Sequence, residues 1–290
     1  MTAKPSPMQF AAGPRARLLG EVITWTCPGL SVAHSTLVEA LVSSGLDPGV
    51  ARELAPRHAF ARACRKLSDR RIIRLVAEDA TTLTFQFTAE SRAGDRYEYV
   101  METLLKLEKQ TGSVTCDLPG LAALAQEELD RCIAVRTGSD VTRIVQRLFE
   151  KQADLFAIRP QGGAYFVPAA HAAFVEKVQG LLGRMNGRLL RFPVPKGIPE
   201  GDRSVREAVA EGLAGLIAEH RQAVAQFGGD TRPDTLERAA AHIRTARFKV
   251  ESYAEYLAEE KARLERELEL AADELRAKVE QLAGEPVPVA

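Results

Sequence analysis

Apolar residues recur at intervals of seven near the C-terminus of this 290-residue chain. The stripe consists of Leu236, Ile243, Val250, Leu257 and Leu264, and it continues on the adjacent position through Leu268, Leu275 and Leu282. No proline or glycine lies between Asp234 and Gly284, so the pattern predicts one uninterrupted helix. At 1.5 Å per residue, about fifty residues would form a rod of roughly 75 Å.

A shorter apolar stripe precedes this region and predicts a helix over residues 202–227. A short loop between two helices predicts an antiparallel helical hairpin over 202–284. Because the second arm is about twice as long, its distal half has no partner within the hairpin. We therefore expect self-association or docking of a protein partner through the 230–284 helix. The expected oligomerisation residues are Leu257, Leu264, Leu268, Leu275 and Leu282.

The first part of the chain mixes helical and alternating patterns. Residues 17–26 predict a strand, three short helices follow between residues 31 and 67, and runs at 71–78 and 81–90 predict strands. The run at 96–109 could form a strand or a helix, and the alternation of Tyr97, Tyr99 and Met101 favours a strand. Three short helices followed by a β-hairpin is the element order of a winged helix, whose third helix enters the DNA major groove.

Residues 118–195 predict a second module. Two helices, at 119–135 and 139–152, precede apolar strands at 155–160 and 164–168, which flank Gln161-Gly162-Gly163. Two strands around a Gly-Gly turn predict a hairpin. A helix over 169–185 and a strand over 188–194 complete the module, and four prolines and glycines after residue 192 mark a linker.

The predicted fold class is therefore α+β, with a winged-helix-like N-terminal domain, a second small α/β module and a long C-terminal helical hairpin or coiled coil. The predicted boundaries are a disordered tail at 1–16, domains at 17–117 and 118–195, a linker at 196–201, the helical hairpin at 202–284 and a tail at 285–290.

Charge is balanced over the whole chain but not along it. Lys plus Arg and Asp plus Glu each number 39, whereas residues 52–74 carry eight basic and two acidic residues, a local net charge of +6. From residue 201 onward, 18 acidic residues outnumber 13 basic ones. The chain thus has a basic region in its N-terminal half and an acidic last third.

The basic segment coincides with the third predicted helix, residues 57–67. Ala59, Phe60, Ala63, Cys64 and Leu67 would form its buried stripe, which leaves basic side chains exposed. Such side chains neutralise phosphates and reach guanine edges. The candidate nucleic-acid-binding residues are Arg57, His58, Arg62, Arg65, Lys66, Arg70 and Arg71. The alternative is a solvated basic face on an ordinary helix.

A second basic face is predicted on the helix over 139–152. Arg143, Arg147 and Lys151 follow one another at a spacing of four, which places them on one side of that helix. This face could bind an anion, or it could simply be the solvated side of the helix.

Sequence motifs for catalysis or metal binding are weak. The five histidines occur in no HExxH or HxH spacing, and the four cysteines form no CxxC pair. Asp95 and Glu98 lie on or between predicted strands, where nuclease-like metal sites place acids, but their spacing from Lys106 does not fit that pattern. We therefore expect no catalytic residues, no metal and no cofactor.

The cysteines also bear on location. Unpaired cysteines indicate free thiols in a reducing compartment, and no run approaches eighteen apolar residues. We expect a cytoplasmic protein with no membrane partner.

Two segments resemble known sequences. AFARACRKL with TLTFQFTAE, and VTRIVQRLFEKQADLFAIRPQGGAYFVP, are similar to segments of uncharacterised proteins of bacterial phages and plasmids, over most of residues 20–195. The resemblance carries no assigned catalytic residue. It implies a role in DNA handling or in conflict between hosts and mobile elements.

The leading functional hypothesis is a non-enzymatic protein that binds double-stranded DNA and assembles through its C-terminal coiled coil. One alternative is a protein-only scaffold or adaptor of a phage- or plasmid-related complex, in which the basic patch meets an acidic protein surface. A second alternative is a metal-dependent nuclease that uses Asp95 or Glu98.

Overall fold

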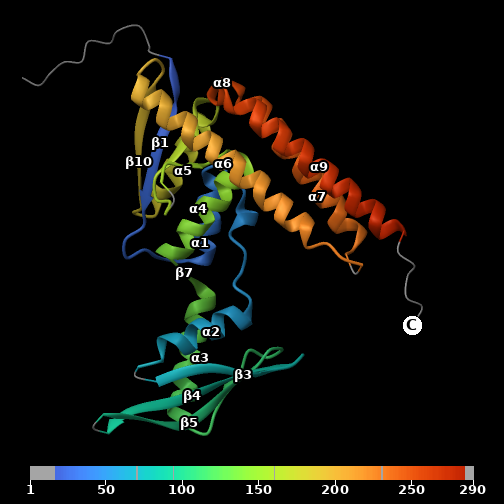
Figure 1. The fold of residues 1–290 in the computed structure, drawn as a ribbon. Coiled ribbons are helices and arrows are strands. Elements are labelled where there is room, and N and C mark those ends of the chain that lie inside the picture. Colours follow the sequence, from blue (N-terminus) through green and yellow to red (C-terminus); the bar gives the residue numbers. More distant parts are fainter. Residues whose placement is uncertain (1–16, 70, 94, 160, 230, 285–290) are drawn as a thin grey trace, which may run out of the picture. The chain divides into compact units, whose positions relative to one another are not determined.

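The computed structural model describes residues 17–69, 71–93, 95–159, 161–229 and 231–284 (Figure 1). The predicted tails at 1–16 and 285–290, and Arg70, lie outside the described residues. The structure is mixed, with helices and several small antiparallel sheets. No helix in the described ranges is both long and apolar enough to cross a membrane.

The chain divides into two compact units. Unit 1 comprises Met1–Trp25, Gln152–Val175 and Leu189–Ala290, and unit 2 comprises Thr26–Lys151 and Glu176–Arg188. This grouping differs from the predicted division at residues 117 and 195. The difference arises because strand β1 (Leu18–Thr26) hydrogen-bonds to strand β9 (Tyr165–Pro168), which joins segments that are distant in sequence.

Unit 1 contains a four-stranded sheet in the order β10-β1-β9-β8, with β10 at Arg188–Pro195 and β8 at Phe156–Ala157. β8 and β9 are antiparallel, which confirms the predicted hairpin, although its strands are shorter than predicted. The turn between them includes Gly162 and Gly163, both with positive φ, a conformation that glycine adopts without strain. A 3₁₀ turn, Ala169–His171, follows β9.

Four helices complete unit 1: α6 (Pro199–Ala225), α7 (Pro233–Ser252), α8 (Ala254–Leu257) and α9 (Glu260–Gly284). α6, α7 and α9 contact one another, and α6 also contacts β8 (Figure 1). Their apolar stripes and the sheet residues Leu19, Phe156 and Phe166 form a single buried core. α6 begins at Pro199, so it includes the last part of the predicted linker.

The prediction of an uninterrupted helix from 234 to 284 is wrong. The helix ends at Ser252, and Ala258 adopts φ 45° and ψ −115°, which reverses the chain into α9. Tyr253, Tyr256 and Leu257 are buried at this bend, and the Tyr256 hydroxyl donates to the Leu19 carbonyl at 2.9 Å.

Burial explains why the chain bends without a proline or glycine. Leu257, Leu264, Leu268 and Leu275 are at most 7% exposed in the core of unit 1, and Leu282 is half-buried. Burying four leucines contributes roughly 6 to 12 kcal/mol, which exceeds the cost of about 1 to 3 kcal/mol for one unfavourable backbone conformation. Four of the five leucines predicted to contact another chain therefore pack within this one, and self-association stays a prediction.

Unit 2 contains two sheets. The larger is antiparallel in the order β3-β4-β5-β6, and the smaller pairs β2 with β7. The strands are β2 (Ser31–Ala33), β3 (Arg71–Glu78), β4 (Thr82–Ala93), β5 (Arg96–Glu108), β6 (Val114–Thr115) and β7 (Val135–Thr137). The helical elements are α1 (His34–Ser43), the 3₁₀ turn Pro48–Val50, α2 (Pro56–Lys66), α3 (Pro119–Ala134), α4 (Gly138–Gln152) and α5 (Ala172–Arg184), which crosses the unit boundary.

Helices α2 and α3 cover one face of the larger sheet (Figure 1). Phe60 of α2, Leu129 of α3, and Leu83, Phe87 and Leu105 of the strands are at most 1% exposed in their common core. The apolar side chains in the first half of β5 lie outside this core. Tyr97, Tyr99, Val100 and Met101 are each more than half exposed.

The element order partly matches the winged-helix prediction. Asp47 caps the second predicted helix, but that element is a single 3₁₀ turn. The predicted hairpin is part of a four-stranded sheet, and α3 packs beside α2. The winged helix as such stays a prediction.

Candidate anion-binding site

The sequence positions helix α2 with one face buried and the other basic. Pro56 occupies its first turn, where a missing N–H costs nothing. Ala59, Phe60, Ala63 and Cys64 are fully buried, as the apolar stripe predicts, and Leu67 packs against the same core while partly exposed. Burial raises the pKa of the Cys64 thiol to about 12, so it stays protonated. The cationic side chains of α2 therefore lie outside this core.

Several of the predicted nucleic-acid-binding residues have acidic partners within the chain. Arg57 lies 3.0 Å from Glu78, and Lys66 pairs with Glu128. Arg71 donates two hydrogen bonds to Glu102, at 2.5 and 2.9 Å. Arg62 pairs with Asp140 in the same two-point manner, at 2.7 and 3.0 Å. The acidic partners offset part of the positive charge of these side chains. The free positive charge on this surface is therefore lower than the net charge of +6 over residues 52–74 indicates.

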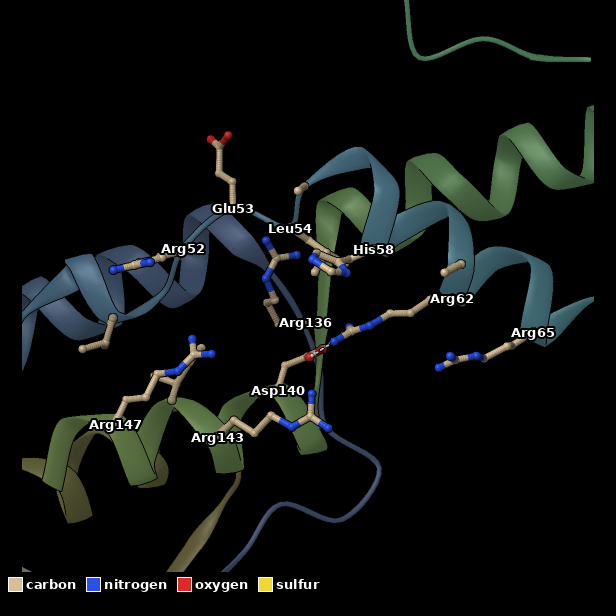
Figure 2. Close-up of a pocket in the computed structure, with 14 residues that line it drawn as sticks. Arg52, Glu53, Leu54, His58, Arg62, Arg65, Arg136, Asp140, Arg143 and Arg147 are labelled. Atoms are coloured by element: carbon tan, nitrogen blue, oxygen red, sulfur yellow. Dashed lines mark hydrogen bonds and ion pairs between the residues drawn. The ribbon is translucent and has the colours of Figure 1, made fainter. Parts of the chain in front are cut away.

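Arg65 and His58 line a cavity of about 630 Å³ in unit 2 (Figure 2). The cavity is formed by α2, the segment that precedes it, β7 and α4. Its charged and titratable lining residues are Arg52, Glu53, His58, Arg62, Arg65, Arg136, Asp140, Arg143 and Arg147. Six arginines and two acidic residues thus line one concave site.

The deepest of these arginines is Arg136 on β7. It is 4% exposed, and its Nη1 donates to the carbonyl of Ile133 at 2.9 Å, near the end of α3. Its Nη2 is buried, and no group within the described residues forms a hydrogen bond with it. Burial lowers the pKa of Arg136, and the neighbouring Arg62 lowers it further while Asp140 opposes this. A buried charged donor without a partner is costly, at about 1 to 3 kcal/mol or more, so this nitrogen favours an incoming acceptor.

Asp140, in the first turn of α4, lines the cavity and accepts several hydrogen bonds. Its Oδ2 accepts hydrogen bonds from the backbone nitrogen and hydroxyl of Thr137, at 3.0 and 2.9 Å, as well as from Arg62. Burial opposes ionisation of this carboxyl, but Arg62 and Thr137 outweigh it and lower the pKa of Asp140 below its ordinary value. The carboxylate therefore holds the start of α4 and fixes Arg62 across the cavity.

Helix α4 supplies two further arginines to the cavity. Arg143 and Arg147, predicted to share one basic face, both line the cavity, and Figure 2 shows them extending from α4 toward the space beside α2. Lys151, the third residue of that face, lies 3.2 Å from Asp47 instead. The structure thus brings together two basic helices whose anion-binding potential the sequence indicates only separately.

Two lining arginines were not among the predicted site residues. Arg52 belongs to the +6 segment, so its charge was visible but its position was not. Arg136 carries no local signal, because a single arginine in a three-residue strand resembles any exposed cation. Its role follows from the pairing of Val32 with Arg136 between β2 and β7, which is a long-range contact.

The metal-site alternative has no cluster to support it in the described residues. No group of three or more His, Cys, Asp and Glu side chains within those ranges is placed to hold a metal ion. Asp95 is fully exposed, with its carboxylate 3.9 Å from Arg92.

The fold and this cavity define a two-unit α and β protein with an arginine-rich candidate site for an anion. The chain belongs to a family of unknown function, DUF6744, and the match spans residues 18–286. The match therefore includes both units and every residue of the cavity. Comparison with curated proteins and with solved structures found no match.

Proposed function

We propose that the protein binds double-stranded DNA through unit 2, with phosphate groups held by the arginine cavity. The observation that carries the proposal is Arg136, a buried arginine that lines a cavity with five other arginines. Its Nη2 has no hydrogen-bond partner in the part of the chain that the structure describes. Guanidinium groups bind phosphates in two-point geometry, and phosphate contacts supply most of the affinity of non-specific DNA binding.

The charge distribution in the cavity supports an anionic ligand. Counted without His58, six arginines against Glu53 and Asp140 leave a net charge of +4. Arg62 pairs with Asp140, whose carboxylate is largely buried. Arg143, Arg147 and Arg65 are exposed and can move to a ligand without breaking a pair with Asp140. The resemblance to proteins of phages and plasmids fits the same proposal, which includes a role in handling the DNA of such elements.

Assembly through the C-terminal helices forms no part of the proposal. Leu257, Leu264, Leu268 and Leu275 are buried within unit 1, so they offer no free stripe for a second chain.

The test is a titration of the full-length protein with a fluorescently labelled duplex of random sequence, measured by anisotropy over a range of salt concentrations. We expect the affinity to fall steeply with salt. The double variant Arg143→Gln and Arg147→Gln should reduce the slope of log K against log salt by about 1.8, which corresponds to two phosphate contacts.

The matched control is Arg276→Gln on α9, which removes one exposed arginine outside unit 2. It should leave both affinity and slope within experimental scatter of the wild type. Absence of salt-dependent DNA binding, or a double variant that binds DNA as the wild type does, would overturn the proposal.

A second candidate is a protein-only scaffold, favoured by the exposed apolar end of β5. Tyr97, Tyr99, Val100 and Met101 form a short apolar segment that a protein partner could cover. This candidate predicts indifference to DNA in the titration above. It also predicts that Tyr97→Ser with Tyr99→Ser lowers the mass of the protein in solution from that of an assembly to that of one chain.

A further inference from the structure

The depth of Arg136 restricts which phosphates can reach it. The Arg136 side chain is almost fully buried, whereas Arg143 and Arg147 of α4, which line the same cavity, are exposed. A phosphate within a DNA strand is attached to a sugar on both sides, so it presents its two free oxygens at the surface of the duplex. Such a phosphate can contact the exposed arginines, but the flanking sugars oppose its entry into a concave site.

A phosphate at a strand end differs in both shape and charge. It is attached on one side only, it has three terminal oxygens, and it carries a charge of roughly −1.5 to −2 at neutral pH. Three oxygens can accept from several guanidinium groups at once, and the extra charge strengthens each of these hydrogen bonds. A cavity with six arginines and two carboxylates matches this higher charge better than it matches a single-charged phosphodiester.

The cavity volume fits a strand end as well. About 630 Å³ lies within the range of roughly 300 to 1,000 Å³ typical of sites for small organic ligands, and it exceeds what one phosphate group needs. A terminal nucleotide together with its phosphate could occupy this volume. Leu54, Ala55, Ala61 and Ile144 supply apolar lining for the sugar or base, beside the cations.

We propose that the cavity recognises the terminal phosphate of a DNA strand, an inference that rests on the proposed DNA-binding function. Arg136 donates from Nη2 to the innermost phosphate oxygen, and Arg143 and Arg147 close over the outer oxygens. Arg62 stays paired with Asp140 and contributes its charge from the side.

The experiment compares duplexes of identical sequence that differ only at their ends: 5′-phosphate, 3′-phosphate or hydroxyl. Affinities for the full-length protein are measured by anisotropy at one fixed ionic strength, with an internal label. We expect one of the phosphorylated ends to bind about tenfold more tightly than the hydroxyl end, a difference of about 1.4 kcal/mol. Inorganic phosphate should abolish this preference at concentrations that leave binding of the hydroxyl duplex unchanged.

The variants Arg136→Gln and Arg143→Gln locate the effect. Both should lose the end preference, while Arg276→Gln on α9 keeps it. Because Arg136 is buried, thermal unfolding of that variant is measured in parallel, and the exposed Arg143 gives an independent test that does not depend on a core position.

The outcomes separate this inference from the proposed function. Equal affinity for all three duplexes in the wild type would overturn end recognition and leave DNA binding intact, whereas no binding to any duplex would overturn the proposed function itself. An end preference that survives in both arginine variants would overturn the assignment to this cavity. Tight binding of a free nucleoside 5′-monophosphate, with equal affinity for the three duplexes, would assign the cavity to a free phosphate ligand and overturn the strand-end inference.

Discussion

Arg62 and Asp140 are 78 positions apart in the sequence and form a two-point ion pair across the arginine cavity. The pair joins α2 to the first turn of α4, where Asp140 also accepts hydrogen bonds from Thr137. One carboxylate therefore connects two basic helices and partly neutralises the site that they enclose. This double role means that its removal should change stability and anion affinity in opposite directions.

Replacing Asp140 with asparagine should lower the free energy of unfolding by about 2 to 3 kcal/mol at neutral pH, because Arg62 loses a charged partner in a largely buried place. Urea unfolding measures this loss. The control is Asp273→Asn in the exposed Arg276–Asp273 pair, which should change stability by less than about 0.5 kcal/mol.

The same substitution should change the acid dependence of stability. The pKa of Asp140 is lowered in the folded protein, so its contribution is present above the unfolded pKa of about 3.9 and is lost as pH falls through the folded value. The difference in unfolding free energy between wild type and Asp140→Asn should therefore shrink below about pH 4. A difference that stays constant down to pH 2 (about two units below that point) would contradict the assignment.

The affinity of the Asp140→Asn variant for anions should rise. The substitution removes one negative charge from the cavity and frees Arg62 to donate to a ligand. If the variant binds DNA more favourably than the wild type by about 1 kcal/mol, its affinity rises roughly fivefold. Anisotropy at fixed salt can resolve this gain. Reduced affinity in a variant that is still folded would show that Arg62 must be held by Asp140 for binding.

The leucines of α9 test whether the C-terminal stripe serves the fold. Leu264 is fully buried, whereas Leu270 on the same helix is 52% exposed. Leu264→Ala should lower the free energy of unfolding by about 2 to 5 kcal/mol, and Leu270→Ala by less than about 0.5 kcal/mol. Neither should change the mass of the protein measured by light scattering. A lower mass for Leu264→Ala, with unit 1 still folded, would instead support the predicted self-association.

His220 makes unit 1 sensitive to pH in the range where histidines titrate. Burial lowers its pKa, and the stacked ring of His242, 5.0 Å away, lowers it further. As pH falls below about 6.5, the unfolded chain takes up this proton before the folded chain does, so stability declines. His220→Gln should reduce the loss of unfolding free energy between about pH 7.5 and 5.5, with His171 responsible for part of what remains, because burial lowers its pKa too.

Local patterns predicted most individual elements. The buried face of α2 follows from Ala59, Phe60 and Ala63 at helical spacing, and the Gly162-Gly163 turn follows from the backbone freedom of glycine. These features depend on neighbours within a few positions, so the sequence contains what determines them.

Long-range contacts account for what the sequence did not predict. The apolar period continues through Ala258 without a residue that breaks helices, and the bend forms because burial of the following leucines outweighs the cost of the unfavourable backbone. In the same way, Arg136 becomes the deepest cation of the site only because β7 pairs with β2. The partners of Arg57 and Lys66 likewise come from other elements, so a count of charges along the chain overstated the free charge.

The discontinuous make-up of unit 1 has a consequence for how the chain folds during synthesis. Strand β1 is made before the elements it packs against, because its neighbours in the sheet lie beyond residue 155 and the helices that complete its core lie beyond residue 198. Every residue that lines the arginine cavity has already been made by position 147. We therefore expect the cavity to form before β1 pairs with its neighbouring strands, so that the candidate site folds earlier than unit 1.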